Sequence, residues 1–355
     1  MAQPQYLPLL ELTRGDTVES LHHGSIAISD SKGHLVAWYG DPQVVTFLRS
    51  TAKPFQALPF FEHGGQAAFD LTPAEIALIC ASHSGTDEHV AVALKIQSKA
   101  GLQETDLLCG VHPPYDDATA DAMRLRGEQP TPNRHNCSGK HTGMLAFARM
   151  QGWSTDNYID LHHPVQREII KTFAEMCALP PEQVRIGIDG CSAPNFAVPL
   201  CNAALAFAKL GDPTSLPPAR AAACRQIVTS MTSHPEMVAG PGRFDTLLMR
   251  NTSGRILAKA GAEGYQGLAL LPGWLGPGSP ALGIAIKIAD GDLRGRARPA
   301  VSLAALWQLG ALSTAELESL AEFGPEFTLS NWRQIQVGLG RPCFRLAFAE
   351  RDIRE

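Results

Sequence analysis

The chain has 355 residues, of which 18% are charged and 45% hydrophobic, and its formal net charge is −5. A slightly acidic chain without basic runs argues against a nucleic-acid partner, and no apolar run approaches the ~18 residues that a membrane span needs. The eight cysteines are scattered without a disulfide framework, and the N-terminus lacks a secretion signal. We therefore expect a cytoplasmic protein with reduced thiols.

The first elements are expected to be strands. Residues 20–48 alternate small and apolar side chains and turn at residues 30–33, a pattern typical of a β-hairpin followed by a third strand. A serine and a lysine three residues apart, Ser29 and Lys32, lie in this turn. Turn geometry gives that spacing no catalytic meaning, so we set this pair aside.

A second pair with the same spacing, Ser50 and Lys53, lies where the strand-like residues 44–48 give way to an apolar helix. Positions i and i+3 share one helix face, so Lys53 can reach the hydroxyl of Ser50. A neutral lysine can activate a serine nucleophile. At an unperturbed pKa, neutrality costs about 4 kcal/mol at pH 7.4, which burial or a second cation must offset. The alternative is a helix-capping serine beside an exposed lysine.

Two later segments supply the expected companions of a serine–lysine nucleophile. Ser82 follows a helix that begins with the capping sequence 72–75, and Lys259 lies on a strand-like run late in the chain. The order serine–lysine, serine, lysine–glycine matches that of serine β-lactamases. The alternative for Ser82 is a cap for the helix expected at 87–101, a role that Thr86 could fill equally well.

A third cluster combines two cysteines with other polar groups. Cys137 and His141 open a helix, and Asp189 and Cys191 follow a short strand. Such side chains could bind a borderline cation if the fold brings them together. No C-x-x-C spacing announces zinc, so small buried thiols are the alternative, and a Cys137–His141 nucleophile pair is another.

The remaining pattern predicts an α+β fold, with an antiparallel sheet built from both chain ends around a large helical insertion. The sheet part comprises about 1–48 and 251–355, and the helix-rich part about 50–250. Expected helices are 164–179, 196–210, 217–231 and 299–309, and expected strands are 255–259, 267–271 and 283–288, followed by a tail. Residues 240–243 are expected to form a turn without a phosphate-binding role.

Together these segments resemble the rhizobial-type L-asparaginases, the third structural class, over nearly the whole chain. The matching segments are 18–22, 49–56, 81–85, 136–144, 189–191 and 259–264. The resemblance implies a serine β-lactamase/glutaminase-like fold, hydrolysis of L-asparagine to L-aspartate and ammonia, and a homodimer.

The resemblance also implies roles for the serines and lysines. Ser50 would be the nucleophile paired with Lys53, and Ser82 would pair with Lys259. The reaction would be acyl transfer, in which Lys53, or Lys259 acting through Ser82, accepts the proton of Ser50. A neutral-lysine mechanism predicts an alkaline activity optimum.

The resemblance further implies that Cys137, Lys140 and Cys191 hold a zinc ion beside the substrate, with Asp189 close by. Arg49, next to the nucleophile, is a candidate for binding the α-carboxylate, although a neighbour on a helix points about 100° away and a structural arginine is the alternative. Arg49 and Asp189 are thus the candidate substrate-binding residues.

Two further functions stay open on this sequence. One is a β-lactamase-like esterase or peptidase, against which the alanine at position 260 argues, because β-lactamases carry a hydroxyl there. The other is a catalytically silent zinc-binding dimer, in which Lys53 would be exposed and Ser50 a helix cap.

Overall fold

The computed structural model describes residues 5–350, which form two compact units. The sheet unit comprises residues 5–48, 198–212 and 260–350, and the helical unit comprises residues 49–197 and 213–259. No helix within residues 5–350 is long and apolar enough to cross a membrane.

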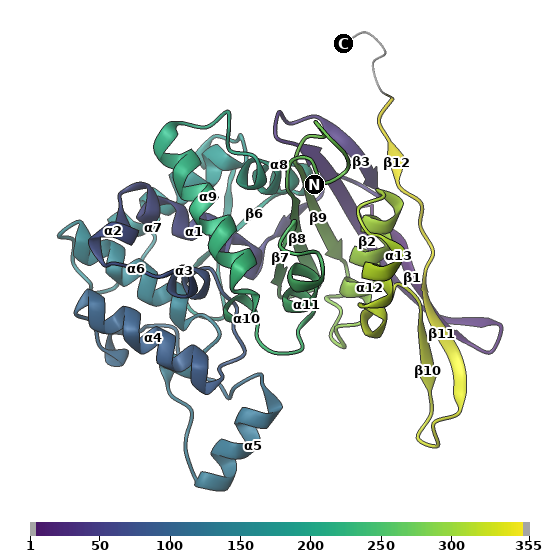
Figure 1. The fold of residues 1–355 in the computed structure, drawn as a ribbon, viewed down its shortest axis with the longest axis horizontal. Coiled ribbons are helices and arrows are strands. Elements are labelled where there is room, and N and C mark those ends of the chain that lie inside the picture. Colours follow the sequence, from purple (N-terminus) through teal and green to yellow (C-terminus); the bar gives the residue numbers. More distant parts are fainter. Residues whose placement is uncertain (1–4, 351–355) are drawn as a thin grey trace. The chain divides into compact units, whose positions relative to one another are not determined.

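The sheet unit is built on an antiparallel sheet with strands from both ends of the chain (Figure 1). Its strand order is β10-β11-β1-β2-β9-β8, with β3 pairing both β2 and β12. The strands of this unit are β1 (Leu7–Arg14), β2 (Thr17–Asp30), β3 (Leu35–Tyr39), β4 (Val45–Phe47), β8 (Tyr265–Leu270), β9 (Leu282–Ile288), β10 (Phe327–Ser330), β11 (Gln336–Pro342) and β12 (Ala347–Phe348). β2 is central to the sheet, and Ile26, Ala27 and Ile28 are fully buried on its two faces.

Three helices and one 3₁₀ turn complete this unit. They are α8 (Leu200–Gly211), α12 (Ala297–Gln308), α13 (Thr314–Glu318) and η5 (Ala321–Phe323). α8 packs on β9 and β2 through an alanine-rich face, so a helix from the middle of the chain belongs to the sheet unit. Small side chains let the helix approach the sheet closely, which explains why this segment leaves the helical unit.

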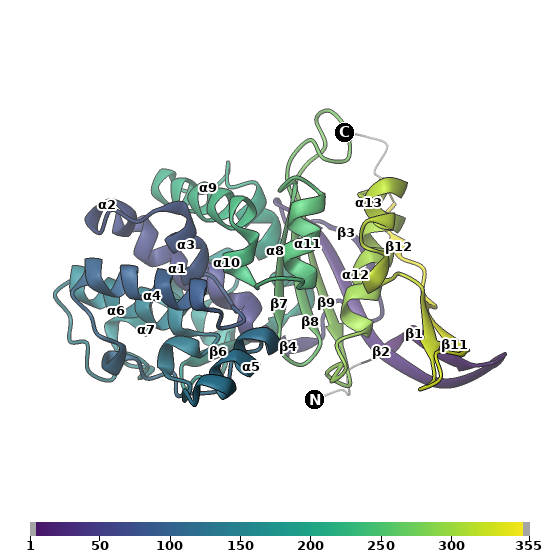
Figure 2. The ribbon, with the colours of Figure 1, turned by 60° about the horizontal axis from the view of Figure 1, so that its bottom comes forward.

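The helical unit packs around α1, which contacts α7, α9, α6 and α3 (Figure 2). Its helices are α1 (Lys53–Glu62), α2 (Gly65–Ala68), α3 (Pro73–Ile79), α4 (Asp87–Ala100), α5 (Asp117–Arg126), α6 (Ser138–Met150), α7 (Pro164–Met176), α9 (Pro218–Ser233), α10 (Pro235–Val238) and α11 (Phe244–Asn251). Its 3₁₀ turns are η1 (Arg49–Ala52), η2 (Glu104–Asp106), η3 (Pro132–Arg134) and η4 (Pro181–Gln183). Two short strands, β5 (Arg185–Ile188) and β6 (Pro194–Pro199), pair antiparallel, and β7 (Ile256–Gly261) begins in this unit.

A close helix contact fixes the beginning of α6. A Cβ added at Gly139 would lie 2.1 Å from the carbonyl oxygen of Leu78, so only a glycine lets α6 approach the end of α3 this closely. Gly143, one turn later, similarly faces Ile79. This contact places Lys140 and its neighbours next to the loop that follows α3.

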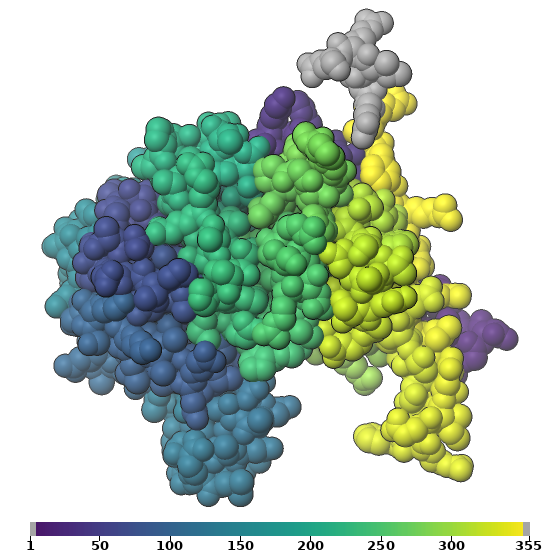
Figure 3. All heavy atoms as spheres, in the orientation of Figure 1, coloured from purple at the N-terminus to yellow at the C-terminus, as the bar shows by residue number. Residues whose placement is uncertain are grey.

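One lobe projects from the helical unit. In Figures 1 and 3 it is α5, near the bottom of the view, and its Leu125 side chain is 89% exposed. The backbone before α5 is held by hydrogen bonds from Tyr115 and Asp116 to the carbonyl of Ser84.

The predicted fold class is confirmed, but some elements differ from the expectation. The strand β1 was not expected, and a register shift between Pro8 and Leu10 explains why, since it lets Leu9 and Leu10 both face the core and breaks the alternation. The expected helix at 196–210 begins only at Leu200, because the proline-bounded β6 precedes it. The expected tail contains α13, β10, β11 and β12, and the late part of the sheet unit begins at residue 260 rather than 251.

Candidate active site

Ser50 lies in η1, the single turn before α1. Its neighbour Arg49 has a φ of +53°, a left-handed conformation that strains a residue with a side chain. The side-chain oxygen of Asn195 accepts the Arg49 backbone N–H at 3.1 Å and so holds this conformation. The Ser50 side chain is half-buried, and its hydroxyl has no hydrogen-bond partner among residues 5–350. It is therefore free to meet a substrate.

Lys53 is completely buried and its three N–H groups meet three oxygens. Its Nζ donates to the carbonyl of Ala81 at 2.6 Å, to Ser82 Oγ at 3.0 Å and to the carbonyl of Asn136 at 3.0 Å. Three acceptors match the three protons of an ammonium group. Lys53 thus points to Ser82, and no direct bond joins it to Ser50 in the described chain.

Lys259, on β7, is also buried and donates to the same Ser82 Oγ at 2.9 Å. Burial, followed by the charge of Lys53, lowers the pKa of Lys259 from 10.5 to about 7. Ser82 therefore lies between a caged ammonium and a lysine that titrates near neutral pH. This is the arrangement that a serine–lysine mechanism needs.

The loop of residues 82–85 is fixed by its own side chains. His83 is fully buried, and its Nδ1 accepts the Gly85 N–H while Nε2 donates to Ser138 Oγ at 2.9 Å. Burial, then neighbouring His89, holds the pKa of His83 well below its ordinary value. The neutral His83 ring, fixed in one tautomer, therefore links the loop of residues 82–85 to Ser138 in the first turn of α6.

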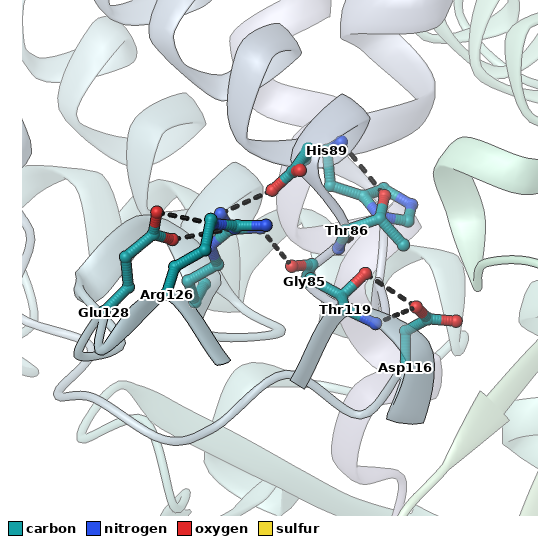
Figure 4. Close-up of polar contacts among 9 residues, drawn as sticks. Gly85, Thr86, His89, Asp116, Thr119, Arg126 and Glu128 are labelled. Carbon is teal, nitrogen blue, oxygen red and sulfur yellow. Dashed lines mark hydrogen bonds and ion pairs between the residues drawn. The ribbon is translucent and has the colours of Figure 1, made fainter. Parts of the chain in front are cut away.

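Figure 4 shows how the helices that follow this loop begin. Thr86, not Ser82, caps α4, with His89 completing the reciprocal pair of hydrogen bonds. Asp116 accepts from the backbone N–H and the hydroxyl of Thr119 at the start of α5. The backbone N–H groups of Tyr115 and Asp116 both donate to the carbonyl of Ser84. The base of the α5 lobe is thus tied to the serine loop.

The sulfur cluster is assembled and buried. Lys140 Nζ donates to Cys191 Sγ at 2.9 Å, and a hydrogen bond with Cys191 holds the pKa of Cys137 well below its usual range, aided by the charges of Lys53 and Lys140. Burial alone would lower the pKa of Lys140, but the two thiols outweigh it and raise that pKa. Both shifts favour the charged forms, a Lys140 ammonium beside a Cys137 thiolate.

These residues fit a zinc ion by their chemistry. Two thiols and one amine are soft and borderline donors that zinc accepts, and the fully buried His141 lies beside Cys191, which acts on its pKa after burial. No group of three or more histidine, cysteine or acidic side chains that could hold a metal occurs in residues 5–350. A metal here would depend on Lys140.

Arg49 and Asp189 form an ion pair. Arg49 Nε donates to Asp189 Oδ1 at 2.7 Å, and the same oxygen accepts the Gly190 N–H. Burial would raise the pKa of Asp189, but Lys140 and then Arg49 lower it overall. Asp189 is therefore a carboxylate that links the arginine beside Ser50 to the sulfur cluster.

The nine candidate residues all lie in the helical unit. No sequence pattern indicated the groups that orient them, notably Asn136, whose carbonyl accepts from Lys53 and whose N–H donates to His112 Nε2 at 3.0 Å. Its side-chain oxygen lies 3.3 Å from the Cys137 sulfur. Main-chain acceptors carry no residue signature, so sequence alone could not reveal them.

Some proteins of known structure are similar to most of this chain. The glutaminase YbgJ of Bacillus subtilis, in covalent complex with 5-oxo-L-norleucine, is similar with a TM-score of 0.36 and 13% identity, covering 81% of this chain and 88% of that one. The structure of Mglu in its native form is similar with a TM-score of 0.35 and 16% identity, covering 83% and 66%. No curated protein sequence matches.

The match to a protein family covers a longer part of the chain. The profile of the family described as L-asparaginase II matches residues 10–342, nearly the whole chain. The matched range includes both serine–lysine couples and the sulfur cluster. The chain therefore belongs to the L-asparaginase II family and is an amidohydrolase acting on amides.

Proposed function

We propose that the protein hydrolyses L-asparagine to L-aspartate and ammonia through an aspartyl ester on Ser50. The observation that supports this most is the position of Ser82 Oγ between Lys53 and Lys259, one of which has a pKa near 7. A neutral lysine at physiological pH removes most of the cost that serine activation otherwise carries.

In the proposed acylation, Ser50 Oγ attacks the side-chain amide carbon of the substrate. The hydroxyl proton passes to Ser82 Oγ as the Ser82 proton passes to neutral Lys259. The Lys53 ammonium keeps its proton, and its positive charge stabilises the negative charge that develops nearby. The tetrahedral adduct then collapses, the C–N bond breaks, and Lys259 returns a proton through Ser82 to the leaving ammonia.

Deacylation reverses these roles. A water molecule attacks the ester carbon while Lys259, again neutral, accepts its proton through Ser82. The C–O bond to Ser50 breaks, and the proton returns to Ser50 as L-aspartate forms. The Ser50 hydroxyl has no hydrogen-bond partner among residues 5–350, so it must turn to Ser82 Oγ when the substrate binds for its proton to be transferred.

We also propose that Cys137, Lys140 and Cys191 hold zinc, and that the protein is a homodimer. A zinc ion would supply a fixed positive charge and a Lewis acid beside the substrate. The chain's own part is to present two thiols and an amine on α6 and the loop after β5, with Asp189 pairing Arg49 next to them. Metal analysis and sedimentation of the purified protein test these two statements.

The central experiment measures ammonia released from L-asparagine and L-glutamine by the wild type, Ser50→Ala and Ser82→Ala. Ser98→Ala, on the exposed face of α4, is the matched control and should keep full activity. We expect Ser50→Ala to lose at least about 10³-fold in kcat and to form no ester detectable by mass spectrometry of quenched protein. Ser82→Ala should form the ester slowly.

Two outcomes would reject the proposal. A wild type that is silent on both amides, with and without added zinc, excludes asparaginase activity. An ester found on Ser82 in the wild type would make Ser82 the nucleophile and Lys259 its direct base.

A further inference from the structure

The turn between α10 and α11, residues 239–243, lies against the serine loop. The Ser82 N–H donates to the carbonyl of Val238 at 2.9 Å, and Ser84 Oγ donates to the carbonyl of Ala239 at 2.7 Å. A Cβ added at Gly240 would lie 2.4 Å from Ser84 Oγ, so only glycine allows this approach. These contacts hold the first part of the turn against the serine loop, and Arg243 follows three residues after Gly240.

Arg243 differs from other arginines of the helical unit. Its side chain is half-buried, yet it makes no hydrogen bond or ion pair with any residue in the range 5–350. By contrast, Arg49 pairs with Asp189 and Arg134 pairs with Asp87. A partly desolvated guanidinium without a counterion is unfavourable by itself, and its planar fork suits a carboxylate.

The charge of Arg243 reaches two groups of the site. It helps to lower the pKa of Lys259, after burial and the charge of Lys53, whereas Asp245 and Cys137 act in the opposite direction. It also opposes the rise in the pKa of Tyr115, a rise caused mainly by burial, and Arg49 acts on Tyr115 in the same way. Lys259 and Tyr115 are therefore both close enough to Arg243 for its charge to act on them.

We propose that Arg243 binds the α-carboxylate of the amino-acid substrate. This inference rests on the proposed amidohydrolase reaction and names a residue that determines its specificity. Arg49, the neighbour of the nucleophile, already donates to Asp189, whereas Arg243 keeps its donors for a ligand. The substrate would then be held at its carboxylate by Arg243 and attacked at its side-chain amide by Ser50.

The test compares two amides that differ only in the carboxylate, L-asparagine and 3-aminopropanamide. In Arg243→Met we expect kcat/KM for L-asparagine to fall about 100-fold, mostly through KM, because a charged hydrogen-bonded pair is lost. kcat/KM for 3-aminopropanamide should stay within about 3-fold. Arg225→Met, on the exposed side of α9, is the control and should change neither value.

Two further measurements make the result decisive. Arg243→Lys keeps the charge but loses the fork, so an approximately 10-fold loss is expected, and this variant serves if Arg243→Met does not fold. Calorimetric binding of L-aspartate to Ser50→Ala should weaken about 100-fold on adding Arg243→Met.

Several results would overturn the inference. Equal losses on both amides, or a changed pH profile with unchanged discrimination, would mean that Arg243 acts only through Lys259. If the wild type releases no ammonia from L-asparagine, the proposed reaction fails, and the binding of L-aspartate alone decides the role of Arg243. L-Aspartate binding that does not depend on Arg243, or no binding at all, rejects it.

Discussion

Lys53 and Lys259 donate to one oxygen atom, Ser82 Oγ, at 3.0 and 2.9 Å. Two ammonium groups so close together repel each other in a buried site. Lys53 donates to the carbonyls of Ala81 and Asn136 as well as to Ser82, whereas burial and then the charge of Lys53 lower the pKa of Lys259 to about 7. In the proposed mechanism, Lys53 supplies charge and Lys259 supplies the base.

The pH dependence of activity should report this division. Because Lys259 acts in its neutral form in the proposed mechanism, kcat/KM for L-asparagine should rise with pH, follow a single apparent pKa near 7, and level off above it. The measurement is a pH–rate profile from pH 5 to 9.5 at constant ionic strength. A flat profile over this range would contradict the role of Lys259.

The buried Lys259 should also destabilise the fold at low pH. Below pH 7 it is protonated in both the folded and the unfolded state, so the burial cost is fully present. Above pH 7 the folded state loses its proton first, and stability rises until about pH 10.5. Lys259→Met should therefore be inactive but more stable at pH 6, by up to about 5 kcal/mol.

Urea unfolding at pH 6, 7.5 and 9 measures this effect. The gain from Lys259→Met should shrink by about 1.4 kcal/mol for each pH unit above 7. Lys95→Met, on the exposed side of α4, is the control and should give no comparable gain. A gain from Lys259→Met that stays constant with pH would mean that the lysine does not titrate as described.

The strained backbone at Arg49 can be separated from its side chain. Arg49→Ala and Arg49→Gly both remove the ion pair with Asp189, so both should lower kcat/KM for L-asparagine by a similar factor. Only glycine relieves the φ of +53°, so Arg49→Gly should be about 1 kcal/mol more stable than Arg49→Ala. Thermal unfolding of the pair measures this difference, and equal stabilities would show that the strain is not significant.

Zinc binding at the sulfur cluster should release protons. The pKa of Lys140 is raised by the two thiols, so its amine must lose a proton before it can bind a metal. Zinc affinity should therefore increase with pH and weaken strongly in Lys140→Met. Calorimetric titration with zinc in buffers of different ionisation enthalpy counts the protons. Binding that is independent of both pH and Lys140 would place the metal elsewhere.

Much of this site could be predicted from the sequence, because its residues lie at element boundaries with strong local signals. Ser82 lies between two helices with clear signals, the cap at Thr72 before α3 and the glycine after α4. The apolar start of α1 locates Lys53. The hydrogen-bond partners of these side chains were harder to predict from the sequence. The i, i+3 spacing suggested a Ser50–Lys53 bond, whereas the hydrogen bonds of Lys53 are to Ser82 and two carbonyls, which depend on long-range packing.

Arg243 illustrates the same limit. Residues 240–243 read as an ordinary turn, and in the chain they are one. What distinguishes Arg243 is its lack of a partner in the folded helical unit and the approach of Gly240 to Ser84, neither of which has a sequence pattern. Element types follow from local chemistry, but the roles of unpaired groups follow from tertiary contacts.

The division of the chain into two units has a consequence for synthesis on the ribosome. The chain passes between the units after residues 48, 197, 212 and 259, so neither unit is one continuous stretch. β1 and β2 emerge first but must wait for β9 and β11, more than 200 residues later, to complete their pairing. Nascent chains that stop before β11 would expose unpaired strand edges, so we expect such truncated products to depend on chaperones and to aggregate.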